Sequence, residues 1–144
     1  PVAKDFREVS TALKMITDIE RFGDQASEIG DLVYTMPGER YIKKLEHITA
    51  MGNLAEKMVR ESVDSFISNN EALANEVIAL DDKMDDLFLT VKKELIELIK
   101  KDGANGDQAI ELMMVAKYLE RIGDHAVNVA EWTKYNETGV HEKF

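Results

Sequence analysis

Apolar residues recur every three or four positions along four long segments, which is the spacing of one face of an α-helix. The pattern predicts helices over residues 3–34, 40–67, 71–100 and 107–135. The stripe expected to face the core in the first helix comprises Val9, Ala12, Leu13, Ile16, Ile19, Ala26 and Val33. The stripe of the third helix comprises Leu73, Val77, Leu80, Met84, Leu87, Val91, Leu95 and Leu98.

Short polar breaks separate these segments and predict how the helices are connected. Residues 36–38, Met-Pro-Gly, end the first helix, residues 68–70 supply a turn and an N-cap, and residues 102–107 form a loop before the last helix. Short connections make neighbouring helices antiparallel, so we expect an all-α, antiparallel helical bundle. An extended coiled coil is the competing interpretation, but the apolar stripes are broader than a heptad seam.

Composition restricts the class of protein and its partners. The 144 residues suit a single domain, with 44% hydrophobic and 32% charged residues. A formal net charge of −10 argues against nucleic acid as a partner and allows cations or basic protein surfaces. There are no cysteines and no long apolar run, so we expect a cytoplasmic protein. Because the chain begins with Pro1, we expect a fragment or a processed product.

One phrase occurs twice, exactly one hundred positions apart, and indicates an internal repeat. Residues 20–26 and 120–126 share Glu, Arg, Gly, Asp and Ala in register. We therefore interpret residues 1–36 as the last helix of one unit and residues 37–144 as a second, complete three-helix unit. Gly123 lies inside the last helix, where glycine costs about 1 kcal/mol relative to alanine, and suggests close approach of a neighbour.

Acidic residues on two of the predicted helices form a candidate cation site. Glu120, Asp124 and Asn128 follow one another at spacings of four on the last helix, and Glu131 continues the row. Asp81 and Asp85 repeat the spacing on the preceding helix. Two such pairs on adjacent antiparallel helices supply the oxygen ligands that hard cations prefer, in a shallow groove at the margin of the apolar stripe.

A simpler interpretation is that these acids form a solvated rim paired with nearby basic residues. Arg21 and Arg121 directly follow the acidic residues and are expected to be ion-pair partners rather than anion ligands. His125 is expected to be a surface histidine. The acidic row would repel phosphate, which needs arginines or fixed N–H donors.

These motifs resemble the PhoU family. The resemblance rests on residues 1–7 (Pro-Val-Ala-Lys-Asp-Phe-Arg), the paired Glu-Arg-x-Gly-Asp phrases and residues 77–85, in the expected order. It implies two three-helix repeats, of which this chain lacks the first two helices. It also implies metal ligands, which fall here on Asp81, Asp85, Glu120 and Asp124, and on Glu20 and Asp24 in the other repeat. The implied metal is multinuclear iron, or else zinc, manganese or magnesium.

The same resemblance implies a regulatory function without catalysis. Such proteins restrain the Pst phosphate transporter and link its ATPase subunit to a phosphate-sensing histidine kinase at the cytoplasmic face of the membrane, and they tend to form homodimers. Two alternatives stay open. One is a PhoU-like domain of a sodium/phosphate cotransporter, or a helical adaptor without metal. The other is a carboxylate-bridged metalloenzyme, which the lack of a histidine ligand pair disfavours.

Overall fold

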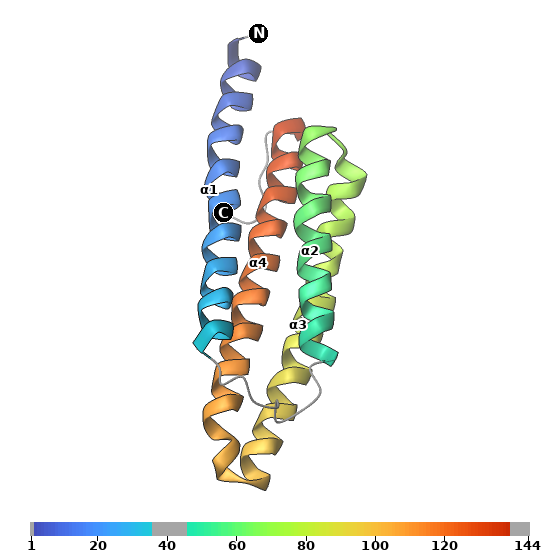
Figure 1. The fold of residues 1–144 in the computed structure, drawn as a ribbon. Helices are drawn as coiled ribbons and strands as arrows, with labels where there is room; N and C mark the ends of the chain where they lie inside the picture. Colours follow the sequence, from blue (N-terminus) through green and yellow to red (C-terminus); the bar gives the residue numbers. More distant parts are fainter. Residues whose placement is uncertain (1, 36–45, 139–144) are drawn as a thin grey trace.

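The computed structural model describes residues 2–35 and 46–138, and its regular elements are all helical (Figure 1). They are α1 (Val2–Thr35), α2 (Glu46–Ile67), α3 (Glu71–Lys101), the short 3₁₀ helix η1 (Gly103–Asn105) and α4 (Gly106–Thr138). The predicted all-α class is thus confirmed, and the predicted helix ends agree to within a few residues wherever they are described. The break predicted at residues 36–38, residues 40–45 of the predicted second helix and the tail after residue 138 lie outside the described residues.

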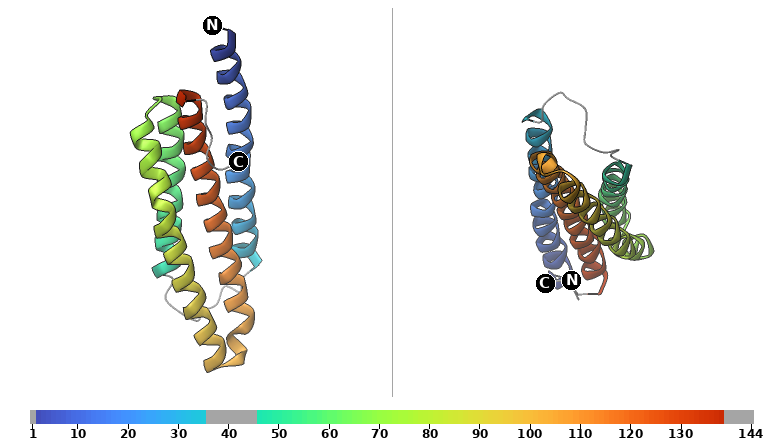
Figure 2. Two further views of the ribbon diagram at one scale, coloured as in Figure 1. Left: turned by 180° about the vertical axis from the view of Figure 1, so that it is seen from behind. Right: turned by 90° about the horizontal axis from the view of Figure 1, so that it is seen from below.

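The helices form an elongated antiparallel bundle in which α4 is central, and this arrangement confirms the prediction (Figure 1). α4 packs against α1 on one side and against α2 and α3 on the other. Figure 2 shows the same separation from behind and from below, with α1 and α2 on different sides of α4. α1 therefore has one main neighbour in the described part of the chain, whereas α2 and α3 each pack against two helices.

Local hydrogen bonds stabilise the connections at both ends of α3. Asn70 is its N-cap, and the side-chain Oδ1 accepts from the backbone N–H of Leu73 at 3.1 Å, as the sequence predicted. At the other end Asp102 Oδ1 accepts from the N–H of Ala104 at 2.9 Å and nucleates η1. The segment predicted as a loop is therefore mostly helical, because the Asp102 side chain organises a tight turn that leads directly into α4.

The core lies between α2, α3 and α4 and contains three fully buried methionines, Met51, Met58 and Met84. The buried residues of α3 are those of the predicted stripe, apart from Ala74. Gly123 of α4 is also buried, and a Cβ added there would lie 3.5 Å from Met84 Cε and 3.6 Å from Met58 Cε. The neighbour suggested by this glycine is thus a pair of flexible side chains rather than a helix backbone.

The prediction that the apolar stripe of α1 faces the core is wrong for most of its members. Val9, Leu13, Ile16 and Ile19 keep between 39% and 63% of their surface exposed. The residues of α1 that face α4 are the buried Thr11 and Asp18 and the half-buried Phe22, Ile29 and Leu32. α1 turns a second, more polar row toward α4 and leaves its main apolar stripe open.

The internal repeat explains why the α1 stripe is open. Ile16 is 51% exposed, whereas Ala116, one hundred positions later on α4, is fully buried; Val9 is 61% exposed and Ala109 only 1%. On α4 these positions are covered by α2 and α3, and α1 has no equivalent pair of helices in the described part of the chain. Apolar stripes of this length are stable in water when another element covers them.

Candidate functional site

The four carboxylates of the predicted cation site lie on the two helices that pack most closely, α3 and α4. Asp81 and Asp85 lie on α3 on either side of the buried Met84. Glu120 and Asp124 lie on α4 on either side of the buried Ile122 and Gly123. Because the Met84 side chain lies beside Gly123 of α4, the two acidic pairs border the same helix–helix contact.

Asp124 lies within electrostatic range of the other three carboxylates. Partial burial raises the pKa of the Asp124 carboxyl above its ordinary value, and the negative charges of Asp81, Glu120 and Asp85 raise it further. The positive charge of Lys117 acts in the opposite direction and lowers this pKa. The cluster is therefore a site of net negative charge that is only partly compensated by the protein.

Lys117 is the basic residue associated with this cluster, and sequence reasoning did not single it out. Its Nζ donates to Glu120 Oε1 at 2.7 Å, one helical turn along α4. The same ammonium lies 5.3 Å from the centroid of the Phe88 ring on α3. Lys117 thus spans the α3–α4 groove. The available signal was the Lys-x-x-Glu spacing of residues 117–120, which brings the two side chains together on a helix.

The donor chemistry of the cluster suits a hard cation, but its side chains do not converge on one point. Among residues 2–35 and 46–138, no three His, Asp or Glu side chains are gathered closely enough to hold a metal ion. Asn128 lies one turn beyond Asp124 and is half-buried. Glu131, which continues the row, is 1% exposed, and its Oε2 accepts no hydrogen bond from the described residues. A cation would require Glu120 to turn away from Lys117.

The first copy of the motif has a different environment. Glu20 and Asp24 are exposed on α1, and Asp24 Oδ2 pairs with Arg21 Nη1 at 3.4 Å. The predicted ion pair of Arg21 is thus confirmed. Arg121, its equivalent on α4, forms no ion pair within the described residues; its guanidinium lies 5.6 Å from the centroid of the Tyr118 ring. The main described neighbour of α1 is α4, and Tyr118 and Arg121 of α4 line a pocket together with Asp24.

His125 is not the surface histidine that the sequence predicted. Its Nδ1 lies 3.1 Å from Asp18 Oδ1 on α1, and the side chains of His125 and Asp18 are only 24% and 13% exposed. The pair joins α1 to α4 across the seam between them. Sequence reasoning missed it because the two residues are 107 positions apart and show no shared spacing signal.

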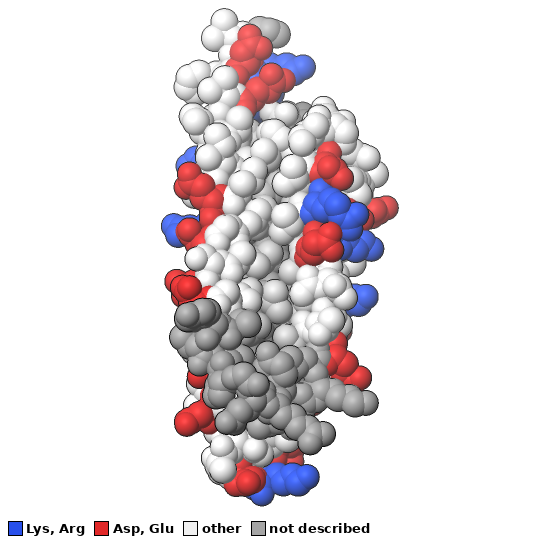
Figure 3. Space-filling view, viewed as in Figure 1, with Lys and Arg blue, Asp and Glu red and all other residues white. Residues whose placement is uncertain are grey.

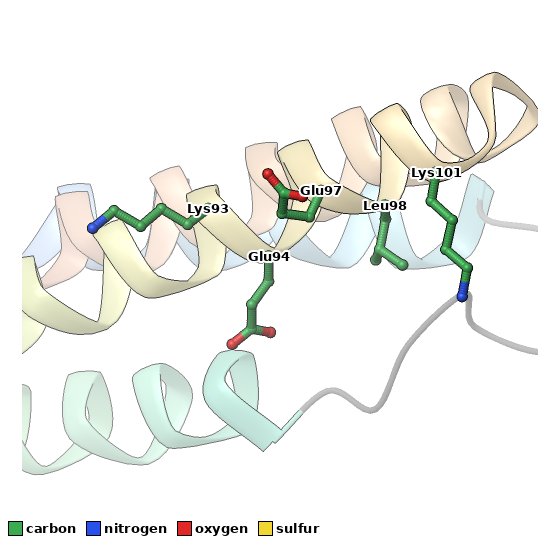
Figure 4. A pocket seen from close by; sticks show the side chains of 5 residues that line it. All are labelled: Lys93, Glu94, Glu97, Leu98 and Lys101. Carbon is green, nitrogen blue, oxygen red and sulfur yellow. The ribbon is translucent and has the colours of Figure 1, made fainter.

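A cavity of about 540 Å³ beside α3 contains none of the predicted ligands (Figure 4). It is lined by Lys93, Glu94, Glu97, Leu98 and Lys101. Figure 4 shows Glu94 pointing from α3 toward the first turn of α2, where it forms an ion pair with His47. This pair fastens α2 to α3, so the cavity is part of a helix contact, far along α3 from the carboxylate cluster.

The raised pKa of Asp124 predicts a pH-dependent stability. The folded state holds this proton more tightly than the unfolded chain does, so the ionised carboxyl opposes folding at neutral pH, and the penalty fades as the pH falls through the folded pKa toward the unfolded one. We expect Asp124→Asn to raise the free energy of unfolding at neutral pH by roughly 0.5 kcal/mol, with a smaller difference in acid. Urea denaturation with a chelator present measures this. Glu76→Gln, an exposed change on the same bundle, is the control, and a destabilised Asp124→Asn would contradict the prediction.

Comparison with known proteins identifies the family of this fold. The family described as the PhoU domain matches residues 1–33 and 48–133. The chain is 37% identical over 138 residues to a protein of Clostridium acetobutylicum named phosphate-specific transport system accessory protein PhoU homolog, covering 96% of this chain and 63% of that protein. A homolog of the same name from Aquifex aeolicus is 37% identical over 121 residues, covering 84% of this chain and 55% of its own length.

Solved structures agree with these sequence matches. The crystal structure of PhoU from Pseudomonas aeruginosa superposes with a TM-score of 0.92 at 30% identity, covering 97% of this chain and 68% of that one. The phosphate transport system regulatory protein PhoU from Streptococcus pneumoniae superposes with a TM-score of 0.86 at 26% identity, covering 98% and 67%. The chain thus spans between 55% and 68% of the length of these relatives. None of its described helices has a stretch long and apolar enough to cross a bilayer.

Proposed function

Because this chain belongs to the PhoU domain family, we propose that it acts as a regulatory accessory protein of phosphate uptake. The observation that carries the proposal is the 37% identity over nearly the whole chain to a protein named as an accessory protein of the phosphate-specific transport system. In this role the protein restrains the Pst transporter and communicates with the phosphate-sensing histidine kinase. It does so by protein contact at the cytoplasmic face of the membrane, and it is not an enzyme.

The distribution of charge and apolar surface supports a role in protein contacts. A net charge of −10 complements basic segments of a partner. Figure 3 shows uncharged surface between α1 and α2, with charged side chains mostly along the outer edges. An apolar groove of about 440 Å³ lies in this region, with Phe22, Ala55 and Ile122 from three helices among its lining residues. A surface of this kind suits a helical segment.

The domain organisation that we propose assigns residues 1–36 to the end of one three-helix repeat and residues 37–144 to a second, complete repeat. The open stripe of α1 supports this assignment, since the equivalent positions of α4 are covered by α2 and α3. The exposed stripe would then be completed by a helix pair like α2 and α3. We also propose that the chain forms a homodimer, and this proposal, like that of the regulatory role, rests on its membership of the PhoU domain family.

Partner binding gives a direct test of the regulatory role. We expect the chain, carrying a terminal affinity tag, to retain the ATPase subunit of the phosphate-specific transporter, or the sensor kinase, from the same organism. A double change on the exposed stripe, Leu13→Glu with Ile16→Glu, reports whether α1 participates, because both side chains are exposed and do not support the core. Failure of the full-length protein to bind either partner at micromolar concentration would contradict the proposed role.

We further propose that the carboxylate cluster binds a metal ion that fixes α3 relative to α4. The donors would be Asp81, Asp85, Glu120 and Asp124, with Asn128 adjacent; Glu20 and Asp24 form a weaker site because no described acid faces them. Oxygen donors suit iron, manganese or magnesium and accept zinc. Burial is the main cause of the raised pKa of Asp124, and repulsion from Asp81, Glu120 and Asp85 adds to it; a bound cation would relieve this repulsion, which supports the proposal. Lys117 would then release Glu120.

Titration calorimetry with Mn²⁺ on chelator-treated protein tests this site. We expect Asp85→Asn with Asp124→Asn to weaken binding at least about tenfold, because two of four charged donors become neutral. Lys117→Met should bind Mn²⁺ about fivefold more tightly, because it keeps packing on Phe88 and removes the competing charge.

Asp24→Asn in the first copy is the matched control for the cation titration and should change the affinity little. The proposal is overturned if the wild-type protein and the double variant bind Mn²⁺ equally. It is also overturned if Lys117→Met binds more weakly than the wild type, because Lys117 would then support the site instead of competing with the ion.

A further inference from the structure

A polar pocket of about 390 Å³ lies on the seam between α1 and α4, separate from the acidic groove between α3 and α4. Arg21 reaches it from α1 and Arg121 from α4. The rest of its lining consists of Asp24, Gln25, Ser27, Glu28 and Tyr118. It therefore combines two fixed positive charges with both hydrogen-bond donors and acceptors.

The internal repeat explains why both arginines reach one pocket. Asp18 of α1 pairs with His125 of α4, and one hundred positions away from each, Tyr118 and Gln25 line the pocket together. The same facing positions thus occur twice along the antiparallel seam, once on each side of an approximate twofold axis. Arg21 and Arg121 are equivalent across that axis, so the symmetry brings two like charges together.

Neither arginine is strongly engaged. Arg21 pairs with Asp24 at 3.4 Å, and both side chains are more than half exposed, which makes this a weak ion pair. Arg121 lies over the Tyr118 ring at 5.6 Å and forms no ion pair with a described residue. On the acceptor side, Gln25 Oε1 is buried without a hydrogen-bond donor from the described residues. Within residues 2–35 and 46–138, the pocket therefore offers a weakly paired arginine, an arginine without an ion pair and an acceptor without a donor.

We propose that this pocket binds a tetrahedral oxyanion that still carries a proton, with inorganic phosphate as the representative ligand. Arg21 and Arg121 would donate to the charged oxygens, because guanidinium groups match phosphate geometry. Asp24, Glu28 or Gln25 would accept from the P–OH group. Sulfate carries no proton at neutral pH and would meet the same carboxylates as a pure acceptor, so it is disfavoured.

This inference goes beyond the proposed partner contacts, because it makes the chain itself a phosphate-binding protein. The acidic lining and the net charge of −10 weaken the attraction of any anion, so we expect a dissociation constant on the order of 1 mM. The pocket uses none of the four acids of the cation site between α3 and α4, and shares only Asp24 with the weaker site proposed on α1. Binding should therefore persist in the presence of a chelator, and its failure is distinguishable from failure of the cation site or of partner binding.

The test is a nuclear magnetic resonance titration of the ¹⁵N-labelled chain with phosphate, at constant ionic strength and with a chelator present. We expect saturable shifts of the Arg21, Gln25, Tyr118 and Arg121 signals. Arg21→Gln with Arg121→Gln should weaken binding at least about tenfold. Arg60→Gln is the matched control, because Arg60 is an exposed arginine on α2 with its own helical partner, Glu56, at 3.6 Å.

Sulfate and an acceptor variant distinguish selective binding from general charge attraction. We expect sulfate to bind at least about fivefold more weakly than phosphate. In the double variant Asp24→Asn with Glu28→Gln, the affinities for the two anions should differ less. All these side chains lie at the surface or at the contact between α1 and α4, so we expect each variant to fold. Dispersed amide signals in the spectrum of each variant would verify this. The proposal is overturned by the absence of saturable shifts up to about 20 mM phosphate, by equal binding of phosphate and sulfate, or by unchanged binding in the double arginine variant.

Discussion

Replacing Met84 with alanine is expected to lower the free energy of unfolding by about 2–5 kcal/mol. Met84 is fully buried on α3, and its side chain fills the space above Gly123 of α4, which has no side chain of its own. Truncation would leave a cavity where α3 packs against α4 beside Gly123, and the glycine has no side chain to fill it. Chemical denaturation followed by circular dichroism measures the loss.

Met114→Ala is the matched control for Met84→Ala, because Met114 lies on α4 with 41% of its surface exposed. We expect it to change the free energy of unfolding by less than about 0.5 kcal/mol. If both variants lose the same free energy of unfolding, the packing of Met84 beside Gly123 does not stabilise the fold as predicted. Met84→Ala should also weaken Mn²⁺ binding, since Asp81 and Asp85 flank the lost side chain on α3.

Replacing Asp18 with alanine is expected to cost about 1–3 kcal/mol of stability. Asp18 is 9% exposed and is the α1 partner of His125, so the change leaves a largely buried imidazole without its acceptor. The damage should be local to the seam, because α1 packs mainly on α4. Amide hydrogen exchange should show α1 exchanging faster while α2 and α3 keep their protection.

Asp24→Ala provides the matched comparison for Asp18→Ala on the same helix. Asp24 is exposed, and its ion-pair partner among the described residues is Arg21, three positions away, so we expect a change within about 0.5 kcal/mol. Equal losses of stability in the two variants would show that the buried pair of Asp18 and His125 stabilises the fold no more than an exposed ion pair does. A loss of protection throughout the bundle in Asp18→Ala would show instead that α1 is needed for the other three helices to fold.

These predictions concern two separate helix contacts. Met84 and Gly123 hold α3 and α4 together beneath the carboxylate cluster. Asp18 and His125 hold α1 against α4. The arginine pocket lies on that second contact and the carboxylates border the first, so cation and oxyanion binding can be tested separately. The first contact underlies the proposed cation site, and the second underlies the proposed oxyanion pocket.

Much of the fold could be predicted from the sequence because local physics decides it. Helical periodicity, the Asn70 cap and the break before α4 are properties of neighbouring residues, and the structure places the described helix ends close to those expected. The repeated Glu-Arg-x-Gly-Asp phrase identified the relation of α1 to α4 and the PhoU family. The spacing of four positions within each acidic pair predicted that Asp81 and Asp85 lie beside Glu120 and Asp124. The electrostatic effect of the other three carboxylates on Asp124 agrees with this placement.

Other features depended on which helices meet. Periodicity shows that α1 has an apolar stripe, but the absence of a described helix over that stripe is a property of the assembly, and the prediction of burial was wrong. The pairing of Lys117 with Glu120 over Phe88, the pairing of Asp18 with His125, and the meeting of Arg21 with Arg121 are likewise tertiary. A sequence determines which face of each helix is apolar or charged. Which face meets which neighbour depends on contacts between residues far apart in the chain, and these arise only when the helices pack together.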